Sequence, residues 1–212
     1  MTTVLVDYES GNLHSAEKAF QRMARETGAG RVLVSDRAED VAAADRIVLP
    51  GDGAFPACKR ALEARAGLHE AIVEAVERRG RPFLGICVGM QMMARAGHEY
   101  ETVPGFGWID GEVVRIAPDA PGLKVPHMGW NDLTILREHP VLAGLETGAH
   151  AYFVHSYHMA MDAPDQLLAT AEYGMPVTAI VARGPTIGTQ FHPEKSQGPG
   201  LRLIANFLSW AP

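Results

Sequence analysis

Short apolar runs alternate with longer amphipathic stretches through the first half of the chain. The apolar runs are nearly continuous in Val, Ile and Leu, which is typical of strands buried on both faces of a parallel sheet. They predict strands over residues 3–8, 31–35, 45–50 and 81–86. The stretches between them follow a helical period, and Ala16, Phe20 and Met23 would share one face of the first. They predict helices over residues 11–26, 56–80 (broken near Gly67) and 88–97 (ending at Gly97).

The second half of the chain is richer in short strand patterns separated by Gly and Pro. It predicts strands over residues 111–116, 151–160, 166–173, 178–184 and 186–191, and a closing helix over residues 198–210. Their quick succession favours antiparallel or mixed pairing on the same sheet. We see no internal repeat, low-complexity stretch or linker. We therefore expect one α/β domain over residues 1–212, with a central, mostly parallel mixed sheet and helices on both faces.

Composition limits the kind of protein this can be. The chain is long enough for one full core, and 47% hydrophobic and 21% charged residues are ordinary for a globular protein. A net charge of −6 gives no sign of a nucleic-acid or anionic-membrane surface. The N-terminus has no basic segment before Asp7, and no apolar run approaches the roughly 20 residues of a membrane span.

The chain has only two cysteines, Cys58 and Cys87, and neither lies in a C-x₂-C or C-x₂-H pair. A disulfide framework and a zinc site are therefore not indicated. We expect a cytoplasmic location and no metal or cofactor.

Cys87 lies in the pentapeptide Gly85-Ile86-Cys87-Val88-Gly89, between a predicted strand and a predicted helix. This G-x-C-x-G pattern is the thiol counterpart of the G-x-S-x-G nucleophile elbow, a tight turn that needs small neighbours. The helix that follows would point its N-terminus at the sulfur and favour the thiolate. A buried structural cysteine is the alternative that the pentapeptide leaves open.

His192 and Glu194 could supply the base that a nucleophile needs. Pro193 between them excludes a helix, and in an extended segment side chains two residues apart project to the same side. The carboxylate could then fix the tautomer of the imidazole and stabilise the imidazolium. A surface turn with incidental charges is the alternative, but strand ends of an α/β sheet converge on one edge. That convergence favours a His192–Glu194 pair beside Cys87.

The segment Pro50 to Phe55 (PGDGAF) follows another predicted parallel strand. Gly51 and Gly53 would let the backbone of residues 51–53 turn its amides toward an oxyanion, together with the Val88 amide. An ordinary strand-to-helix turn would have the same composition. This segment is therefore a candidate oxyanion hole that depends on the other two motifs.

Taken together, these motifs resemble those of the class I, triad-type glutamine amidotransferases. The stretches that carry the resemblance are GICVGMQ (85–91), FHPEKS (191–196) and PGDG (50–53). Within that family, further stretches are similar to the glutaminase subunits of imidazole glycerol phosphate synthase, from histidine biosynthesis. They are DYESGNLHS (7–15), GFGWIDGEVVRI (105–116), KVPHMGWNDL (124–133) and YFVHSYH (152–158). The resemblance covers essentially the whole chain.

The resemblance implies a reaction and a set of roles. Cys87 would attack the side-chain amide of glutamine, His192 would protonate the departing ammonia, and Glu194 would hold His192. Water would then hydrolyse the γ-glutamyl thioester. The amino-acid end of glutamine would be held by Gln91, Glu99, Ser156 and Tyr157.

The resemblance also implies a partner, a (β/α)₈-barrel cyclase that receives the ammonia in a heterodimer and forms imidazole glycerol phosphate and an aminoimidazole carboxamide ribotide. Asn12, Met128 and Trp130 lie in the stretches tied to that complex and are the candidate interface. Trp130 could equally be a core residue. His155 and His158 are expected to be structural or interfacial, because the triad already has its base.

Two other functions remain as alternatives. One is a glutaminase that serves another synthase, for example in pyridoxal phosphate, anthranilate or aminodeoxychorismate synthesis. The other is a binding module that kept the fold, against which the intact Cys87, His192 and Glu194 argue. One residue departs from the usual P-G-V-G of the oxyanion strand, because Asp52 stands at the third place. We expect its side chain to point away from the site.

Overall fold

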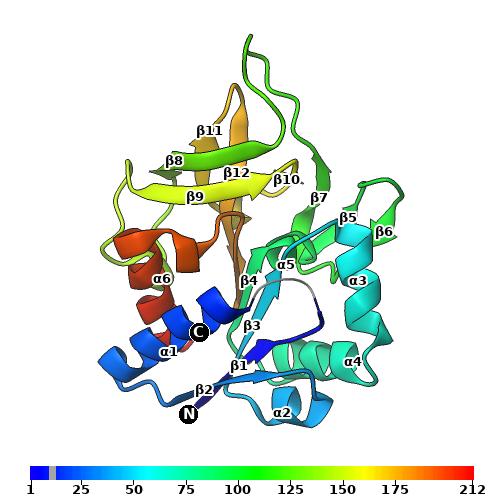
Figure 1. Cartoon of the computed structure of the whole chain (residues 1–212), viewed down its shortest axis with the longest axis vertical. Coiled ribbons are helices and arrows are strands. Elements are labelled where there is room, and N and C mark those ends of the chain that lie inside the picture. Colours follow the sequence, from blue (N-terminus) through cyan, green and yellow to red (C-terminus); the bar gives the residue numbers. More distant parts are fainter. Residues whose placement is uncertain (10–12) are drawn as a thin grey trace.

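Among residues 1–9 and 13–212, which the computed structural model describes, nine strands form one long sheet with a parallel and an antiparallel half (Figure 1). The parallel half has the order β2-β1-β3-β4-β13. Its strands are β1 (Thr2–Val6), β2 (Arg31–Ser35), β3 (Arg46–Gly51), β4 (Phe83–Cys87) and β13 (Thr186–Thr189). Register places Gly51, at the end of β3, directly beside Cys87, at the end of β4. The strand ends that carry the motifs therefore converge on one edge, as expected.

The antiparallel half continues the same sheet in the order β12-β11-β8-β9. Its strands are β12 (Pro176–Arg183), β11 (Leu167–Glu172), β8 (His127–Ile135) and β9 (His150–His155). In the long sheet, the strands from the first half of the chain pair in parallel and most of those from the second half pair antiparallel, which follows the two sequence patterns. The exception is β13, which pairs in parallel with β4.

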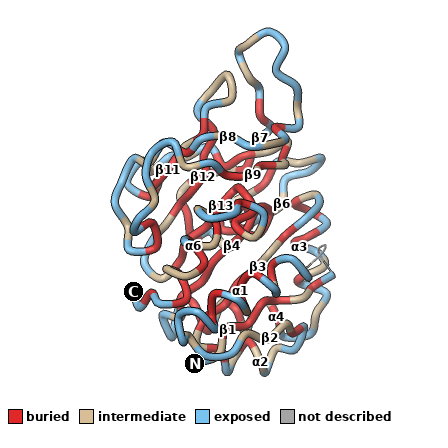
Figure 2. The backbone as a smooth tube through the Cα atoms, turned by 60° about the vertical axis from the view of Figure 1, so that its left-hand side comes forward, coloured by how far each residue is buried: buried red, intermediate tan, exposed pale blue. Residues whose placement is uncertain are grey.

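Helices cover both faces of the parallel half (Figure 1). Helix α1 (His14–Thr27) packs against α6 (Gln197–Ser209) on one side. On the other side lie α2 (Ala38–Ala43), α3 (Phe55–Ala64), α4 (Leu68–Val73) and a π-helical turn (Glu74–Arg78). Short 3₁₀ turns occur at Pro140–Leu142, Pro164–Gln166 and Pro193–Lys195. The strands between the helices are buried over most of their length (Figure 2), so the core lies within this sandwich.

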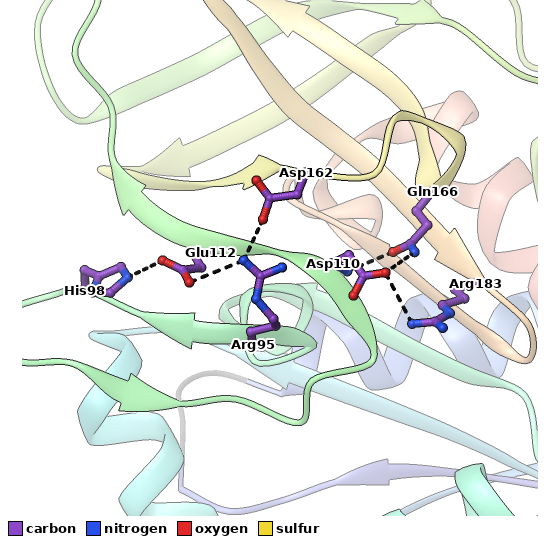
Figure 3. Close-up of polar contacts among 7 residues, drawn as sticks. All are labelled: Arg95, His98, Asp110, Glu112, Asp162, Gln166 and Arg183. Atoms are coloured by element: carbon purple, nitrogen blue, oxygen red, sulfur yellow. Dashed lines mark hydrogen bonds and ion pairs between the residues drawn. The ribbon is translucent and has the colours of Figure 1, made fainter.

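A second, four-stranded sheet has the order β10-β7-β5-β6. Its strands are β5 (Ala94–Gly97), β6 (Val103–Pro104), β7 (Ile109–Arg115) and β10 (Tyr157–Met161). Asp110 of β7 exchanges two hydrogen bonds with Gln166, at 2.7 and 2.8 Å, and pairs with Arg183 of β12 (Figure 3). Arg95 of β5 bridges Glu112 and Asp162. Exposed ion pairs contribute little stability each. The Asp110–Arg183 pair links the small sheet to the large one, whereas the contacts of Arg95 lie within the small sheet.

The expected helix over residues 88–97 is wrong in its second half. Helix α5 covers only Val88–Gln91, and Ala94–Gly97 is strand β5. Met90, Met92 and Met93 are all fully buried in the core. A segment without a polar face carries no helical period, so its pattern fits a buried strand equally well.

Three strand assignments in the second half also differ from the expectation. The single strand predicted over residues 151–160 is two strands, because the chain leaves the long sheet at Ser156 and enters the small one. The strand over 111–116 likewise belongs to the small sheet. Strand β8 was not predicted as a strand, since Gly129 and its polar neighbours hide the alternation. The fold class, an α/β protein with a mixed sheet covered by helices, is confirmed.

Gly89→Ala is expected to destabilise the protein severely. A Cβ at this position would lie 1.8 Å from the carbonyl oxygen of Leu49, and backbone on both sides leaves no room to move. We expect a loss of about 3 kcal/mol in the free energy of unfolding, the upper end for overpacking. Urea denaturation measures it. Gly198→Ala in α6, where a Cβ meets nothing within 4 Å, is the control and should cause no loss. Equal stability of the two variants would contradict the close packing at the turn.

Candidate active site

Cys87 occupies a sharp turn between β4 and α5. Its backbone angles are φ 54° and ψ −111°, a conformation that costs an L residue free energy and clusters at functional sites. The turn closes because Gly85 and Gly89 approach each other, and a Cβ on Gly85 would lie 2.5 Å from the Gly89 carbonyl oxygen. Cys87 as a whole is 4% exposed. The strand-turn-helix geometry predicted for this pentapeptide is therefore present.

His192 and Glu194 lie together at the start of a 3₁₀ turn. The imidazole Nδ1 is 2.8 Å from a carboxylate oxygen of Glu194, so Nδ1 carries the proton and donates it. Backbone bonds hold His192 from both sides, because its N–H donates to the Tyr152 carbonyl at 3.0 Å and its carbonyl accepts from Ser196 Oγ at 2.6 Å. The opposite ring nitrogen, Nε2, is buried and has no hydrogen-bond partner in the described part of the chain. It is therefore available to a reacting group.

The charge on His192 depends on its two neighbours. Burial lowers the pKa of His192, but the interactions with Cys87 and Glu194 outweigh burial and raise the pKa to about 10. The imidazole is therefore protonated at neutral pH. Nucleophile and base commonly reach ideal hydrogen-bond geometry only with substrate present. The arrangement is a cysteine sulfur beside an imidazolium that a carboxylate orients.

A cavity of about 260 Å³ opens onto Cys87. Its lining includes most of the residues predicted for the site. They are Asp52, Gly53, Cys87, Val88, Gln91, Glu99, Ser156 and Tyr157, joined by Pro126, Val154 and His155. Gly51 abuts the turn, since a Cβ there would lie 2.7 Å from the Gly89 nitrogen. The structure thus brings the predicted oxyanion segment and the predicted glutamine contacts to one cavity beside the thiol.

Asp52 is exposed although it is one of the residues that line the cavity. Its backbone carbonyl faces inward toward Cys58, whose sulfur lies 3.8 Å away. Burial raises the pKa of the Cys58 thiol to about 11, so this second cysteine stays protonated. Cys58 and Cys87 are both free thiols. Of the two, only Cys87 lines the cavity.

Gln190 is a site residue that the sequence interpretation missed. Its side chain is fully buried, and its Nε2 lies 3.7 Å from the sulfur of Cys87. In an extended segment, side chains two residues apart project to the same side, and Gln190 precedes His192 by two residues. Gln190 is therefore expected on the same side as His192. That spacing was the available signal.

Comparison with known proteins agrees with this geometry. The sequence profile described as "Glutamine amidotransferase class-I" matches residues 4–210. A protein of Cereibacter sphaeroides called "Imidazole glycerol phosphate synthase subunit HisH" is 74% identical, and one of the same name from Ruegeria pomeroyi is 64% identical. Both alignments cover the whole of each chain.

The chain belongs to the class I glutamine amidotransferase family. The resemblance in the sequence is thereby confirmed. Among solved structures, a glutamine amidotransferase superposes with a TM-score of 0.73 at 20% identity, over 98% of this chain and 99% of that one. The glutaminase domain of the Trypanosoma brucei protein CTPS has a TM-score of 0.70 at 15% identity, over 99% of this chain and 91% of the other. These likenesses support the class I glutamine amidotransferase fold.

Two of the three predicted interface residues of this amidotransferase lie on strand β8. Met128 is 62% exposed and Trp130 is 48% exposed, so Trp130 is not a core residue. The Trp130 ring packs against Tyr152 of β9, whose carbonyl holds the backbone of His192. Asn12 lies outside the described residues. The exposed apolar face of β8 is therefore only one strand away from the segment that carries the imidazole.

The described part of this amidotransferase holds no group of three or more His, Cys, Asp or Glu side chains that could bind a metal ion. Within the same residues, no helix is long and apolar enough to cross a membrane.

The stability of this amidotransferase should fall as the pH rises from about 6.5 to about 10. Folded His192 keeps its proton up to a pKa of about 10, whereas the unfolded side chain loses it near 6.5. The stabilisation is therefore complete below pH 6.5 and lost toward pH 10. Glu194→Gln removes one of the interactions that raise this pKa, so its loss of stability over the same window should be shallower. Urea denaturation at a series of pH values tests this. Parallel curves for the two proteins would contradict the charged pair.

Proposed function

We propose that this amidotransferase hydrolyses glutamine with Cys87, His192 and Glu194 and passes the ammonia to a separate cyclase subunit. The sulfur of Cys87 attacks the side-chain amide carbon, and the imidazolium of His192 gives its proton to the nitrogen that leaves as ammonia. The proton that His192 holds at neutral pH supports this assignment, since a general acid must be protonated before it acts. Water then attacks the γ-glutamyl thioester, His192 accepts the proton of that water, and glutamate leaves.

The observation that carries this proposal is the oriented imidazole beside an elbow thiol. Glu194 accepts from Nδ1 at 2.8 Å, which leaves Nε2 as the only ring nitrogen for proton transfer. A carboxylate that holds the ring also stabilises the imidazolium, as in other triads. Cys87 sits at the start of α5, where the turn presents the sulfur to the cavity. A buried structural cysteine would need neither feature.

The cavity has the chemistry to bind the amino-acid end of glutamine. The Nε2 of Gln91 donates to the Tyr157 carbonyl at 2.9 Å, and its Oε1 has no partner among the described residues. That oxygen can accept from the ammonium group of the substrate. One carboxylate oxygen of Glu99 accepts from the Phe55 N–H, and the other can face the same ammonium. At about 260 Å³ the cavity lies below the roughly 300–1,000 Å³ of drug-sized ligand sites, which suits one amino acid.

The oxyanion of the tetrahedral intermediate is assigned to the segment Gly51 to Gly53 and the Val88 amide. These groups line or adjoin the cavity on the side of the Cys87 turn. Backbone donors aimed at a developing charge contribute about 3 kcal/mol or more to catalysis in other enzymes. The side chain of Asp52 is exposed, which is consistent with a carboxylate that points away from this charge.

The chain is the glutaminase subunit of an imidazole glycerol phosphate synthase, which is an enzyme of histidine biosynthesis. We further propose that its partner is a (β/α)₈-barrel cyclase and that the two form a heterodimer. The cyclase would dock on the face of β8 that exposes Met128 and Trp130. Direct transfer has a chemical reason, because ammonia released into water at neutral pH is mostly protonated and no longer nucleophilic. We assign the reaction to the cytoplasm, where Cys87 stays a reduced thiol.

Cys87→Ala should abolish glutamine-dependent synthesis by the assembled complex and leave ammonia-dependent synthesis unchanged. The thiol acts only in releasing ammonia, so the cyclase reaction does not need it. Steady-state rates with glutamine or with an ammonium salt measure both activities. Cys58→Ala is the matched control, because Cys58 does not line the cavity, and it should keep both. Loss of both activities in a correctly assembled Cys87→Ala complex would overturn the division of labour.

Trp130→Ala should weaken association with the cyclase by about 2 kcal/mol or more, the scale of an aromatic anchor. The ring is about half exposed in the isolated chain and packs on Tyr152, so it offers a large area at small entropic cost. Titration calorimetry measures the change. Leu136→Ala, an equally exposed apolar residue just beyond β8, is the control and should alter affinity little. Unchanged affinity for Trp130→Ala would place the interface elsewhere.

A further inference from the structure

Two buried histidines contact each other beside the cavity and have no part in the triad. His127 of β8 and His155 of β9 are a cross-strand pair, 2% and 6% exposed. Their Nδ1 and Nε2 atoms, respectively, lie 3.0 Å apart. His127 is also stacked between the rings of Phe153 and Tyr173. Polar side chains are rarely buried in this way without complete hydrogen bonding.

The groups at the two ends of this pair fix the direction of its hydrogen bonds. His155 Nδ1 lies 2.8 Å from the Tyr157 carbonyl, which can only accept, so Nδ1 carries the proton and Nε2 must accept. His127 Nδ1 is then the donor, and its Nε2 must accept from Asn131 Nδ2 at 3.1 Å. The second N–H of that amide donates to the Glu172 carbonyl at 2.8 Å. Both imidazoles are therefore neutral Nδ1–H tautomers.

Protonation of either ring would break this order, because two N–H groups would then face each other. Burial lowers the pKa of His127 to about 4 and, together with lesser effects of its neighbours, that of His155 to about 3. The pair therefore keeps one fixed polarity at neutral pH.

The same chain of bonds continues to the nucleophile. Gln91 Nε2 donates to the Tyr157 carbonyl at 2.9 Å and to Gln190 Oε1 at 3.2 Å. That acceptance orients the Gln190 amide, whose Nε2 then faces the sulfur of Cys87. The Tyr157 carbonyl is the junction, because it accepts from both His155 and Gln91. It stands just after Ser156, where the chain crosses the cavity wall between the two sheets.

We propose that His127 and His155 are positioning residues that tie strand β8 to the Gln190 amide, which donates a hydrogen bond to the Cys87 sulfur and stabilises its thiolate form. This role rests on the function proposed above. Along β8, His127 and Asn131 face inward to this chain of bonds, while Met128 and Trp130 are exposed on the outside. A shift of β8 on docking would therefore reach the sulfur through a continuous series of hydrogen bonds.

The test begins with the tautomers. Two-bond ¹H–¹⁵N spectra of the ¹⁵N-labelled chain at neutral pH should show His127 and His155 as neutral Nδ1–H rings. Asn131→Asp has the same shape but cannot donate, so His127 Nε2 must become a donor to the new carboxylate. An Nε2–H signal or a protonated ring at His127 is the expected change. Wild-type Nε2–H tautomers at either residue would overturn the proposal.

The second readout is the sulfur itself. In the complex with the cyclase, Asn131→Asp should lower kcat/KM for glutamine about tenfold and slow alkylation of Cys87 by iodoacetamide, with ammonia-dependent synthesis unchanged. His127→Phe keeps the ring stacking without the hydrogen bonds and should behave alike. Asp132→Asn is the control. It replaces a carboxylate with an amide on the exposed neighbour of Asn131, and it should change neither kcat/KM for glutamine nor the rate of alkylation.

A kcat/KM and an alkylation rate within twofold of wild type for both Asn131→Asp and His127→Phe, in folded proteins, would overturn the proposal. A wild-type complex that does not hydrolyse glutamine would instead overturn the proposed function, and with it this role. The tautomer spectra do not depend on turnover, so the two failures are distinguishable.

Discussion

The close approach of backbone at the Cys87 turn is the constraint on which the site depends. The Leu49 carbonyl of β3 lies where a Cβ of residue 89 would be, and Gly85 and Gly89 meet across the turn. In the same turn, φ of Cys87 is positive and Cys87 lines the cavity. The close approach also sets the oxyanion segment beside the nucleophile, because β3 and β4 end in register at Gly51 and Cys87. One packing constraint therefore places two of the three catalytic elements.

The third element is held by hydrogen bonds rather than by packing. His192 follows β13, the neighbour of β4, and is tied through its backbone to Tyr152 and Ser196. Its charge is maintained by Cys87 and Glu194 against the effect of burial. A buried charge without such partners would be strongly disfavoured. The ion-paired site thus requires both the rigid turn and the oriented carboxylate, and neither is sufficient alone.

The sequence was informative where a motif coincides with a strand end. The parallel strands, the elbow and the His192–Glu194 spacing follow from local rules, and strand order then brings them together. The failures lie where local patterns are ambiguous. The apolar run after Cys87 fits a helix or a strand, and the chain crosses between sheets at Ser156 without any Gly or Pro to signal it. The His127–His155 contact depends on the pairing of β8 with β9, which no local pattern reveals.

The central claim is that Cys87 is the only nucleophile that attacks glutamine. Covalent trapping tests this claim most directly. The complex with the cyclase would be incubated with a glutamine-derived chloroketone and then analysed by intact mass and peptide mapping. The account predicts a single adduct on Cys87, slowed by added glutamine, with Cys58 unmodified because burial keeps that thiol protonated. An adduct on Cys58, or no adduct on a complex that still consumes glutamine, would contradict it.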